Sequence, residues 1–574
     1  MRKLFVFALV AMLAAAGLGF AGGEEETTAA AAMSDGGPIY GGTFTLAPRW
    51  GNKPGSPDPA DGNLGRTWYH ELIQETPMIG DFDTYGPRGS GDFDFKLIGA
   101  IPMKYIKGNL IDSWEVDQSK ITWTVKSGIY WAPTEAQSAW MDAREFTAED
   151  LASDLRHWAT GPEGARLLAN KDANIYAEGD RVIIEFAAFD FILNATLGLS
   201  RAGFVGPPEM LEDGRIARWE DQVGTGPFMF AEYVPDQFFR MVKNPNYRGT
   251  TMVDGEEYQL PFLDEFIIPL ANDESFEEAA LRTGIADGGP SVYGTHWDTL
   301  DRTAPDLIQD RLPISFGGTF AFNTSQPPFD NRDVRRALLV GTNLDDFAAQ
   351  RGAKGVDLPE HWWPIYPSLA SYTPQSELPP ETAMLYEYDP EKAKQMLADA
   401  GYPDGFTVDF YTGNWATILQ QAAIMKDQWA KMGVEFNIIV NDGAIHNQII
   451  KDGGYDMTRM GYGSGNPVRD MPNNWASWGS RNQYHFNDPK FDEYARAMQA
   501  EMDEDKRDAI IKEAAVYILN EVTAIPLAVK AISQAWWPWV KNYYGEFRWI
   551  NDDTYVMPWG WAWIDPSIKQ EMGY

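Results

Sequence analysis

Aromatic and polar side chains that could bind a small molecule gather in one stretch, residues 459–478. Its rings belong to Tyr462, Trp475 and Trp478, whose flat faces could stack on sugar rings or on apolar groups. Packing in a protein core is the alternative role for the same three rings. Trp415, which follows the end of a predicted strand, is the best single candidate ring outside this stretch. These residue types favour non-covalent binding.

Motifs for catalysis or nucleotide hydrolysis do not occur. No Gly-x-x-x-x-Gly-Lys-Ser/Thr loop is present, which excludes the motor of a transporter. Ser464 in Gly463-Ser464-Gly465 lacks the spacing of a hydrolase elbow and any evident partner. The 83 acidic residues keep a secreted glycoside hydrolase as a distant alternative, although no acid pair can be located. The histidines show no metal-binding spacing and are expected to be surface or packing residues: His70, His157, His296, His361, His446 and His485. We therefore expect no catalytic residue, metal or cofactor.

Composition bounds the class of protein. A chain of 574 residues exceeds the size at which one core keeps growing, about 250 to 300 residues, so two or more domains are expected. The 22 Trp and 25 Tyr can fill a large core and still leave rings for a binding surface. A net charge of −36 argues against nucleic acid or an anionic membrane as partner, and solubility alone would also explain it. Because there is no cysteine, disulfides and thiolate metal sites are impossible.

The N-terminus has the pattern of a secretory signal. Two basic residues precede an apolar run over residues 4–18, and small residues, Gly19 and Ala21, stand before a plausible cleavage point. A membrane anchor would need about 20 apolar residues, and this run is shorter. We predict a signal peptide over residues 1–21 and a flexible leader over residues 22–38. The mature chain is expected outside the cytoplasm.

Strand and helix signals place these residues. Apolar runs at residues 228–233 and 238–242 flank Val-Pro-Asp-Gln and predict a β-hairpin. Thr147, with an acid three residues later, predicts a helix start. Asp330 and Asp389 are the expected caps of two later helices. Strands and helices then alternate, which indicates a mainly parallel sheet covered by helices; the expected segments are 406–411, 416–432, 434–440 and 444–451.

Three motifs together resemble one family. They are Gly-Thr-Gly-Pro-Phe at residues 224–228 with Lys-Asn-Pro-Asn-Tyr at 243–247, the Pro-Phe-Asp to Arg-Arg-Ala-Leu run at 328–338, and Tyr-Asp-Pro-Glu-Lys-Ala-Lys to Ala-Gly-Tyr at 388–402. The order and spacing are similar to those of the family 5 extracellular solute-binding proteins. These are the peptide, nickel and oligosaccharide receptors of ATP-driven importers.

The resemblance spans nearly the whole mature chain and implies an α/β, periplasmic-binding-protein-like fold of the large cluster C type. Two lobes would be joined by a hinge, with an extra subdomain inserted into the first lobe. The implied segments are 39–62, 205–300 and 530–574 for lobe I, 63–204 for the inserted subdomain, and 301–529 for lobe II.

The resemblance also implies a function. A monomeric receptor, not an enzyme, would capture a solute, nominally a peptide, in the interlobe cleft and deliver it to ABC permease subunits. Many relatives carry a lipid anchor on a cysteine after the signal, which this chain lacks, so a secreted or periplasmic location is implied.

In peptide-binding relatives an aspartate holds the peptide's ammonium group, but the matching position here is Gly465, and the nearest carboxylate is Asp470. Arg459 stands where the family often has an arginine. The missing aspartate makes an oligosaccharide a serious alternative ligand. The predicted ligand-binding residues are Trp415, Arg459, Tyr462, Gly463, Ser464, Gly465, Asp470, Trp475 and Trp478.

Overall fold

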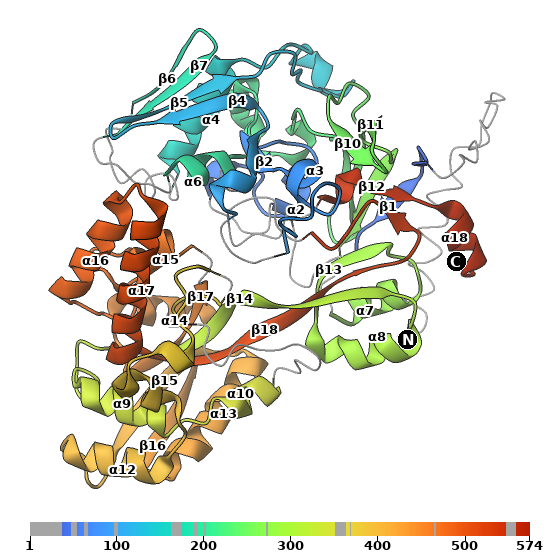
Figure 1. The fold of residues 1–574 in the computed structure, drawn as a ribbon. Helices are drawn as coiled ribbons and strands as arrows, with labels where there is room; N and C mark the ends of the chain where they lie inside the picture. The colour runs from blue at the N-terminus through green and yellow to red at the C-terminus, as the bar shows by residue number, and fades with distance from the viewer. Residues whose placement is uncertain are drawn as a thin grey trace.

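The structure, a computed structural model, describes most of the chain in an α/β fold of two lobes (Figure 1). The predicted signal peptide and nearly all of the predicted leader lie outside the described residues. The described residues are 37–47, 54–61, 67–96, 101–161, 174–186, 193–199, 203–270, 274–350, 363–367, 369–463, 466–546 and 558–574.

Lobe I contains a four-stranded sheet in the order β1-β12-β9-β8. The predicted hairpin is confirmed as β8 (Phe228–Val234) and β9 (Phe238–Lys243), antiparallel with Val234 opposite Phe238. Two further strands complete the sheet, β1 (Thr43–Thr45) and β12 (Glu265–Pro269), and two helices belong to the same lobe, α7 (Glu274–Arg282) and α8 (Trp297–Thr303). Buried tryptophans of the C-terminal segment, among them Trp539 and Trp559, fill this core.

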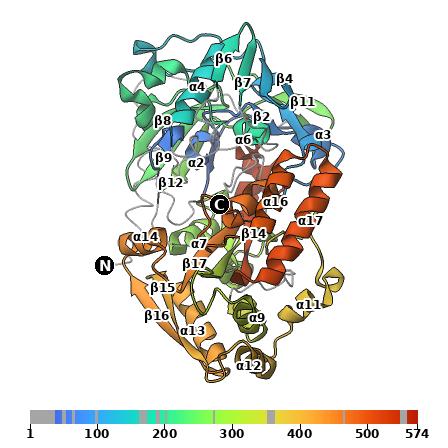
Figure 2. The same cartoon turned by 90° about the vertical axis from the view of Figure 1, so that its left-hand side faces the viewer.

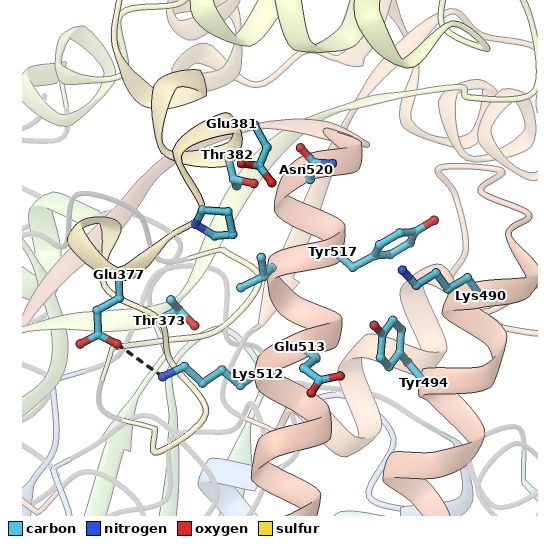
Figure 3. A pocket seen from close by; sticks show the side chains of 12 residues that line it. Thr373, Glu377, Glu381, Thr382, Lys490, Tyr494, Lys512, Glu513, Tyr517 and Asn520 are labelled. Atoms are coloured by element: carbon cyan, nitrogen blue, oxygen red, sulfur yellow. Dashed lines mark hydrogen bonds and ion pairs between the residues drawn. The ribbon is translucent and has the colours of Figure 1, made fainter.

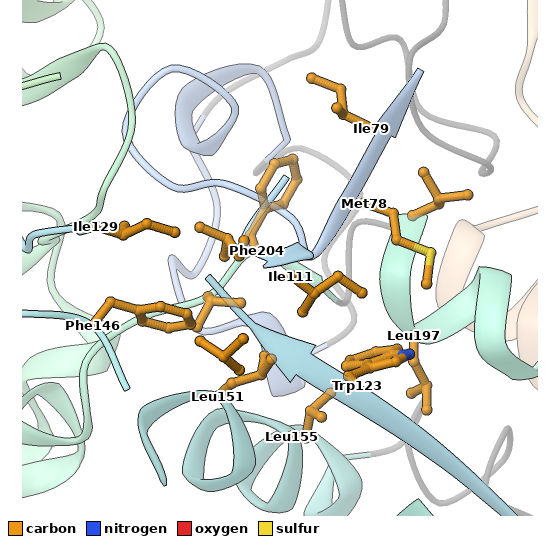
Figure 4. Packing of buried hydrophobic residues seen from close by; sticks show 14 of the residues in the cluster. Met78, Ile79, Ile111, Trp123, Ile129, Phe146, Leu151, Leu155, Leu197 and Phe204 are labelled. Atoms are coloured by element: carbon orange, nitrogen blue, oxygen red, sulfur yellow. The ribbon is translucent and has the colours of Figure 1, made fainter. Parts of the chain in front are cut away.

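The inserted region has its own antiparallel sheet and core. The strands β4 (Ile111–Val116), β5 (Lys120–Val125), β7 (Arg181–Glu185) and β6 (Asn174–Glu178) pair in that order, and α4 (Ala148–Thr160) packs on them. In Figure 4, Leu151 and Leu155 of α4 point toward Trp123 of β5. The predicted cap is confirmed, because Thr147 accepts from the backbone N–H of Asp150 while the Asp150 carboxylate accepts from that of Thr147.

A six-stranded sheet joins the lobes, in the order β13-β18-β14-β17-β15-β16. Its strands are β13 (Gly288–Tyr293), β18 (Ala524–Trp536), β14 (Ile308–Phe322), β17 (Met457–Gly463), β15 (Phe406–Gly413) and β16 (Val434–Asn441). Parallel pairing is confirmed for the strands from which it was expected, because β15 runs parallel to both β16 and β17. The sheet as a whole is mixed, because three further pairs join it. The other pairs are antiparallel because β14 and β18 run in opposite directions between the lobes.

These two long strands form the hinge. β14 and β18 run side by side from the helices of lobe II to α7 and α8 of lobe I (Figure 1). Their pairing shifts register between Pro313 and Gly317 and again between Gly317 and Thr319. Such irregularities bend a strand locally, so the connection between the lobes has a defined point of flexure.

Helices cover both faces of the lobe II sheet. α9 (Arg332–Val340), α12 (Pro390–Asp399) and α13 (Ala416–Ala430) share one core, and α15 (Pro467–Trp475), α16 (Pro489–Ala500) and α17 (Glu504–Glu521) share another. In Figure 2, α16 and α17 stand on the opposite side of this lobe from β16 and α13.

Asp389 caps α12 as predicted, but the expected cap at Asp330 is wrong. Asn331 caps α9 instead, and its side-chain oxygen accepts from the backbone N–H of Asp333. The smaller elements are α2 (Thr67–His70), β2 (Met78–Gly80), α3 (Phe82–Tyr85), β3 (Ile106–Gly108), α6 (Leu193–Leu199), β10 (Thr250–Val253), β11 (Glu256–Gln259), α10 (Asp345–Gln350), α11 (Pro380–Ala383), α14 (Gly443–Asp452), β19 (Val540–Lys541), β20 (Trp563–Ile564) and α18 (Pro566–Glu571).

Candidate functional site

Arg459 places an unpaired cation on the lobe II sheet. It lies on β17 opposite Phe320 of β14, and its guanidinium packs over Gly318, where an added β-carbon would lie 3.6 Å from Nε. The Nε atom is buried without a hydrogen-bond partner, and no ion pair or hydrogen bond to Arg459 occurs among the described residues. Burial lowers the pKa of Arg459. Arg459 as a whole is half-buried, and a cation held partly away from water is costly unless an anion pairs with it, so this position is suited to an anionic ligand group.

Trp415 lies at the carboxyl end of β15, immediately before α13. Its side chain is 46% exposed, and its ring covers Gly413, where an added β-carbon would lie 2.7 Å from the ring. The ring meets His446 of α14 edge-on, with centroids 5.6 Å apart. Burial lowers the pKa of His446, which favours its neutral form, and its Nδ1 has no hydrogen-bond partner in the described part of the chain. Trp415 thus offers an accessible ring face for stacking.

Tyr462 and Trp475 lie in the lobe II core. Tyr462 is 1% exposed, and its hydroxyl donates to the carbonyl oxygen of Pro364 at 2.8 Å. Trp475 is fully buried, and its Nε1 donates to the hydroxyl of Thr523 at 2.9 Å. The two rings contact each other at 5.2 Å. These contacts correspond to the packing alternative given above, and a ligand role for either residue stays a prediction.

The remaining predicted residues differ in their surroundings. The buried Asp470 carboxylate accepts from Arg469 Nε at 2.8 Å and from the backbone N–H of Asn466, the residue before α15, at 3.2 Å, so the structure gives it local partners at the start of this helix. Trp478 is 46% exposed, with the guanidinium of Arg496 4.4 Å from its ring centroid. Gly463 ends β17, and Ser464 and Gly465 lie outside the described residues.

His446 was missed by the sequence analysis because a single histidine in a helix is normally a packing residue. The structure alone reveals that its buried Nδ1 has no partner beside an exposed ring. Within the described ranges, no three histidine, aspartate or glutamate side chains gather into a metal site, and no helix is long and apolar enough to span a bilayer.

A pocket lies between α16, α17 and the segment 373–382 that contains the start of α11 (Figure 3). It has a volume of about 480 Å³. The ammonium of Lys490 lies 4.8 Å from the ring centroid of Tyr517, and Lys512 pairs with Glu377 at 3.5 Å. Because its lysines already have ring or carboxylate partners, this pocket is a weaker candidate than the surroundings of Arg459.

Comparisons with known proteins agree with this architecture. Residues 106–485 match the family model of bacterial extracellular solute-binding proteins, family 5 middle region. Heme-binding protein A of Haemophilus influenzae is 26% identical over 76% of this chain and 81% of its own length. The dipeptide-binding protein of Escherichia coli is 24% identical over 76% and 83%. A periplasmic binding protein of Helicobacter pylori, solved with the peptide STSA, superposes with a TM-score of 0.70 at 19% identity, over 92% and 98% of the two chains. The family match covers well over half of the sequence, so this chain belongs to family 5 of the bacterial extracellular solute-binding proteins.

Proposed function

We propose that this chain is the extracytoplasmic receptor of an ABC importer, which captures a peptide in its interlobe cleft and hands it unchanged to permease subunits. Family membership supports this assignment, and so does a hinge made of two paired strands that pass between the lobes. A dipeptide-binding relative and a fold neighbour solved with a peptide favour peptides as the solute class. The receptor acts as a monomer and is exported by residues 1–21, and its lobes follow the segments given from the sequence.

The observation that carries the peptide assignment is the unpaired guanidinium of Arg459. A peptide carries a terminal carboxylate, which binds an arginine by charged, often bidentate, hydrogen bonds. Such a ligand would supply the anion that Arg459 lacks. A neutral saccharide would leave this cation unpaired, so charge favours the peptide.

The second candidate is an oligosaccharide receptor of the same fold. The half-exposed rings of Trp415 and Trp478 favour it, because flat aromatic faces stack on sugar rings. The two candidates differ in the ligand group that dominates binding. Carboxylate pairing at Arg459 predicts binding that weakens with salt, whereas ring stacking predicts little dependence on salt.

Capture from defined mixtures tests the proposal. The purified mature chain is incubated with random tetrapeptides and, separately, with a ladder of neutral oligosaccharides. It is then desalted, and the bound species are identified by mass spectrometry. We expect peptides to be retained with unchanged mass. Retention of saccharides alone would favour the second candidate, and conversion of either mixture into products would support a hydrolase.

A further inference from the structure

Gln534 in lobe I carries an unusual buried amide. It lies on β18 opposite Asp310 of β14 and is fully buried, yet among the described residues neither its Oε1 nor its Nε2 has a hydrogen-bond partner. Buried polar groups are nearly always paired, because an unpaired one loses its hydration without compensation. The opposite face of the sheet is occupied at this point, where Ser533 accepts from Trp297 Nε1 at 3.0 Å. The unused hydrogen-bonding capacity of the Gln534 amide therefore lies on the other face of the sheet from Ser533.

Asp310, the cross-strand neighbour of Gln534, already holds an ammonium group. Its carboxylate pairs with Lys96 Nζ at 2.6 Å, and the two side chains are 29% and 30% exposed. The two side chains are thus partly exposed, while the Oδ2 atom of Asp310 that contacts Lys96 is itself buried beside the amide. The long lysine side chain can withdraw into water at small cost, because half-exposed ion pairs contribute little stability. Lys96 demonstrates that an ammonium fits at this carboxylate.

The surroundings favour positive charge. The buried Tyr543 interacts electrostatically with three carboxylates, those of Glu71, Asp310 and Glu546. The nearby cations are Arg88 and Lys96. Arg88 is already bound to Glu546. With Lys96 withdrawn, the described groups here hold more negative than positive charge, so an incoming ammonium would be attracted.

The backbone at Gly545 restricts access to the carboxylate of Asp310. Gly545 lies against Asp310 with φ +86°, and an added β-carbon would approach Asp310 Oδ2 to 2.6 Å. Only glycine combines this left-handed conformation with so close an approach. The carboxylate is therefore covered from one side and remains open toward Lys96.

We propose that Asp310 and Gln534 form a lobe I subsite for the amino end of a peptide. The α-ammonium group replaces Lys96 on Asp310, and the first peptide group pairs with the amide of Gln534, which offers both a donor and an acceptor. This inference rests on the proposed peptide receptor. It supplies, on lobe I, the ammonium-binding carboxylate that the sequence lacks at position 465, and it leaves Arg459 on lobe II for the terminal carboxylate.

A competition experiment tests the subsite. Random tetrapeptides with free amino termini are mixed in equal amounts with the same library acetylated at the amino terminus, and mass spectrometry gives the ratio bound. The parent chain should favour free amines by about tenfold or more, because a charged hydrogen bond is lost on acetylation. Asp310→Asn should bring the ratio close to one. Gln534→Leu should weaken the retention of both libraries by about tenfold.

Gln309→Leu is the matched control. It precedes Asp310 on β14, so its side chain lies on the other face of the sheet, where its Nε2 donates to Asp301 at 2.8 Å. It should leave retention and ratio unchanged. Thermal unfolding checks integrity, and Gln534→Leu should unfold at the same temperature as the parent or higher, because it removes an unpaired buried amide.

Two results are distinguishable. A parent chain that retains peptides without preferring free amines, or an Asp310→Asn variant that keeps the parent ratio, overturns the subsite and leaves the receptor in place. A parent chain that retains neither library overturns the peptide assignment itself.

Discussion

A half-buried arginine without an anion among the described residues is a poor choice for stability and a good one for capture. The Nε of Arg459 is enclosed over Gly318 without a partner, although most buried cations in proteins are paired. The amide of Gln534 is likewise buried without a hydrogen-bond partner among the described residues. Both groups lie on strands of the sheet that joins the lobes. We interpret them as capacity kept for the solute at the expense of the ligand-free state.

Replacing Arg459 should therefore separate stability from binding. In Arg459→Met the side chain keeps its length and loses its charge, so the ligand-free chain should gain about 1 kcal/mol in free energy of unfolding. Retention of tetrapeptides should fall by about tenfold or more. Denaturant titration and calorimetry measure the two effects. Arg496→Met, whose guanidinium lies over the exposed Trp478, is the control and should leave peptide retention unchanged.

Asp154 should give the inserted region a stability that depends on pH. This carboxyl group is buried in α4. One oxygen accepts from the backbone N–H of Gly206, and the other has no hydrogen-bond partner among the residues that the structure describes. Burial raises its pKa from 3.8 to about 7, against the opposing effects of Gly206 and His157. Its stabilising contribution is complete below pH 3.8 and is lost as pH rises toward 7.

The neutral variant Asp154→Asn should consequently be more stable than the parent at pH 8, by on the order of 1 to 4 kcal/mol, and nearly equal to it at pH 4. Unfolding by urea at the two pH values measures this difference. Asp180→Asn, in the exposed turn between β6 and β7, is the control. An Asp154→Asn variant less stable than the parent at pH 8 would show that the carboxylate is compensated.

At the scale of elements, the features that could be predicted are those that depend only on residues close together in the sequence. The Thr147 and Asp389 caps and the hairpin at β8 and β9 follow from local patterns, and the structure confirms them. The prediction that Asp330 caps α9 failed because the neighbouring Asn331 can also cap a helix, and only the packing of α9 decides between the two residues. The parallel pairing of β15 with β16 and β17 was predicted, but the antiparallel half of the sheet was not, since β14 and β18 pair across about 200 residues of sequence.

The capping box of α4 allows a test at this scale. Thr147→Ala removes the oxygen that accepts from the backbone N–H of Asp150, so the free energy of unfolding should fall by about 1 kcal/mol. Thr147→Ser keeps that oxygen and should restore most of the loss. Both are measured by denaturant titration, and an equal loss in the two variants would assign the effect to the missing methyl group.

For the whole molecule, the order of three distant motifs predicted the fold class, because each motif marks a strand or helix end that the fold needs in that place. The binding residues were harder to predict. In the sequence, all four rings are aromatic residues near predicted strand ends or loops and cannot be told apart. In the structure, Tyr462 and Trp475 are buried, whereas Trp415 and Trp478 are exposed. Unpaired groups such as Arg459 and Gln534 become visible only when every potential partner has a position.

Closure about the β14–β18 hinge is the final prediction. The chain has no cysteine, so Asp180→Cys in the inserted region and Glu391→Cys in lobe II can carry a fluorophore pair without other labelling. A solute that contacts both lobes favours the closed form, so the transfer efficiency of this pair should change when retained peptide is added. The pair Glu391→Cys and Asp503→Cys lies within lobe II and should not respond. Equal responses of both pairs would indicate rearrangement inside lobe II, because bending at the register shifts of β14 moves the lobes as rigid bodies.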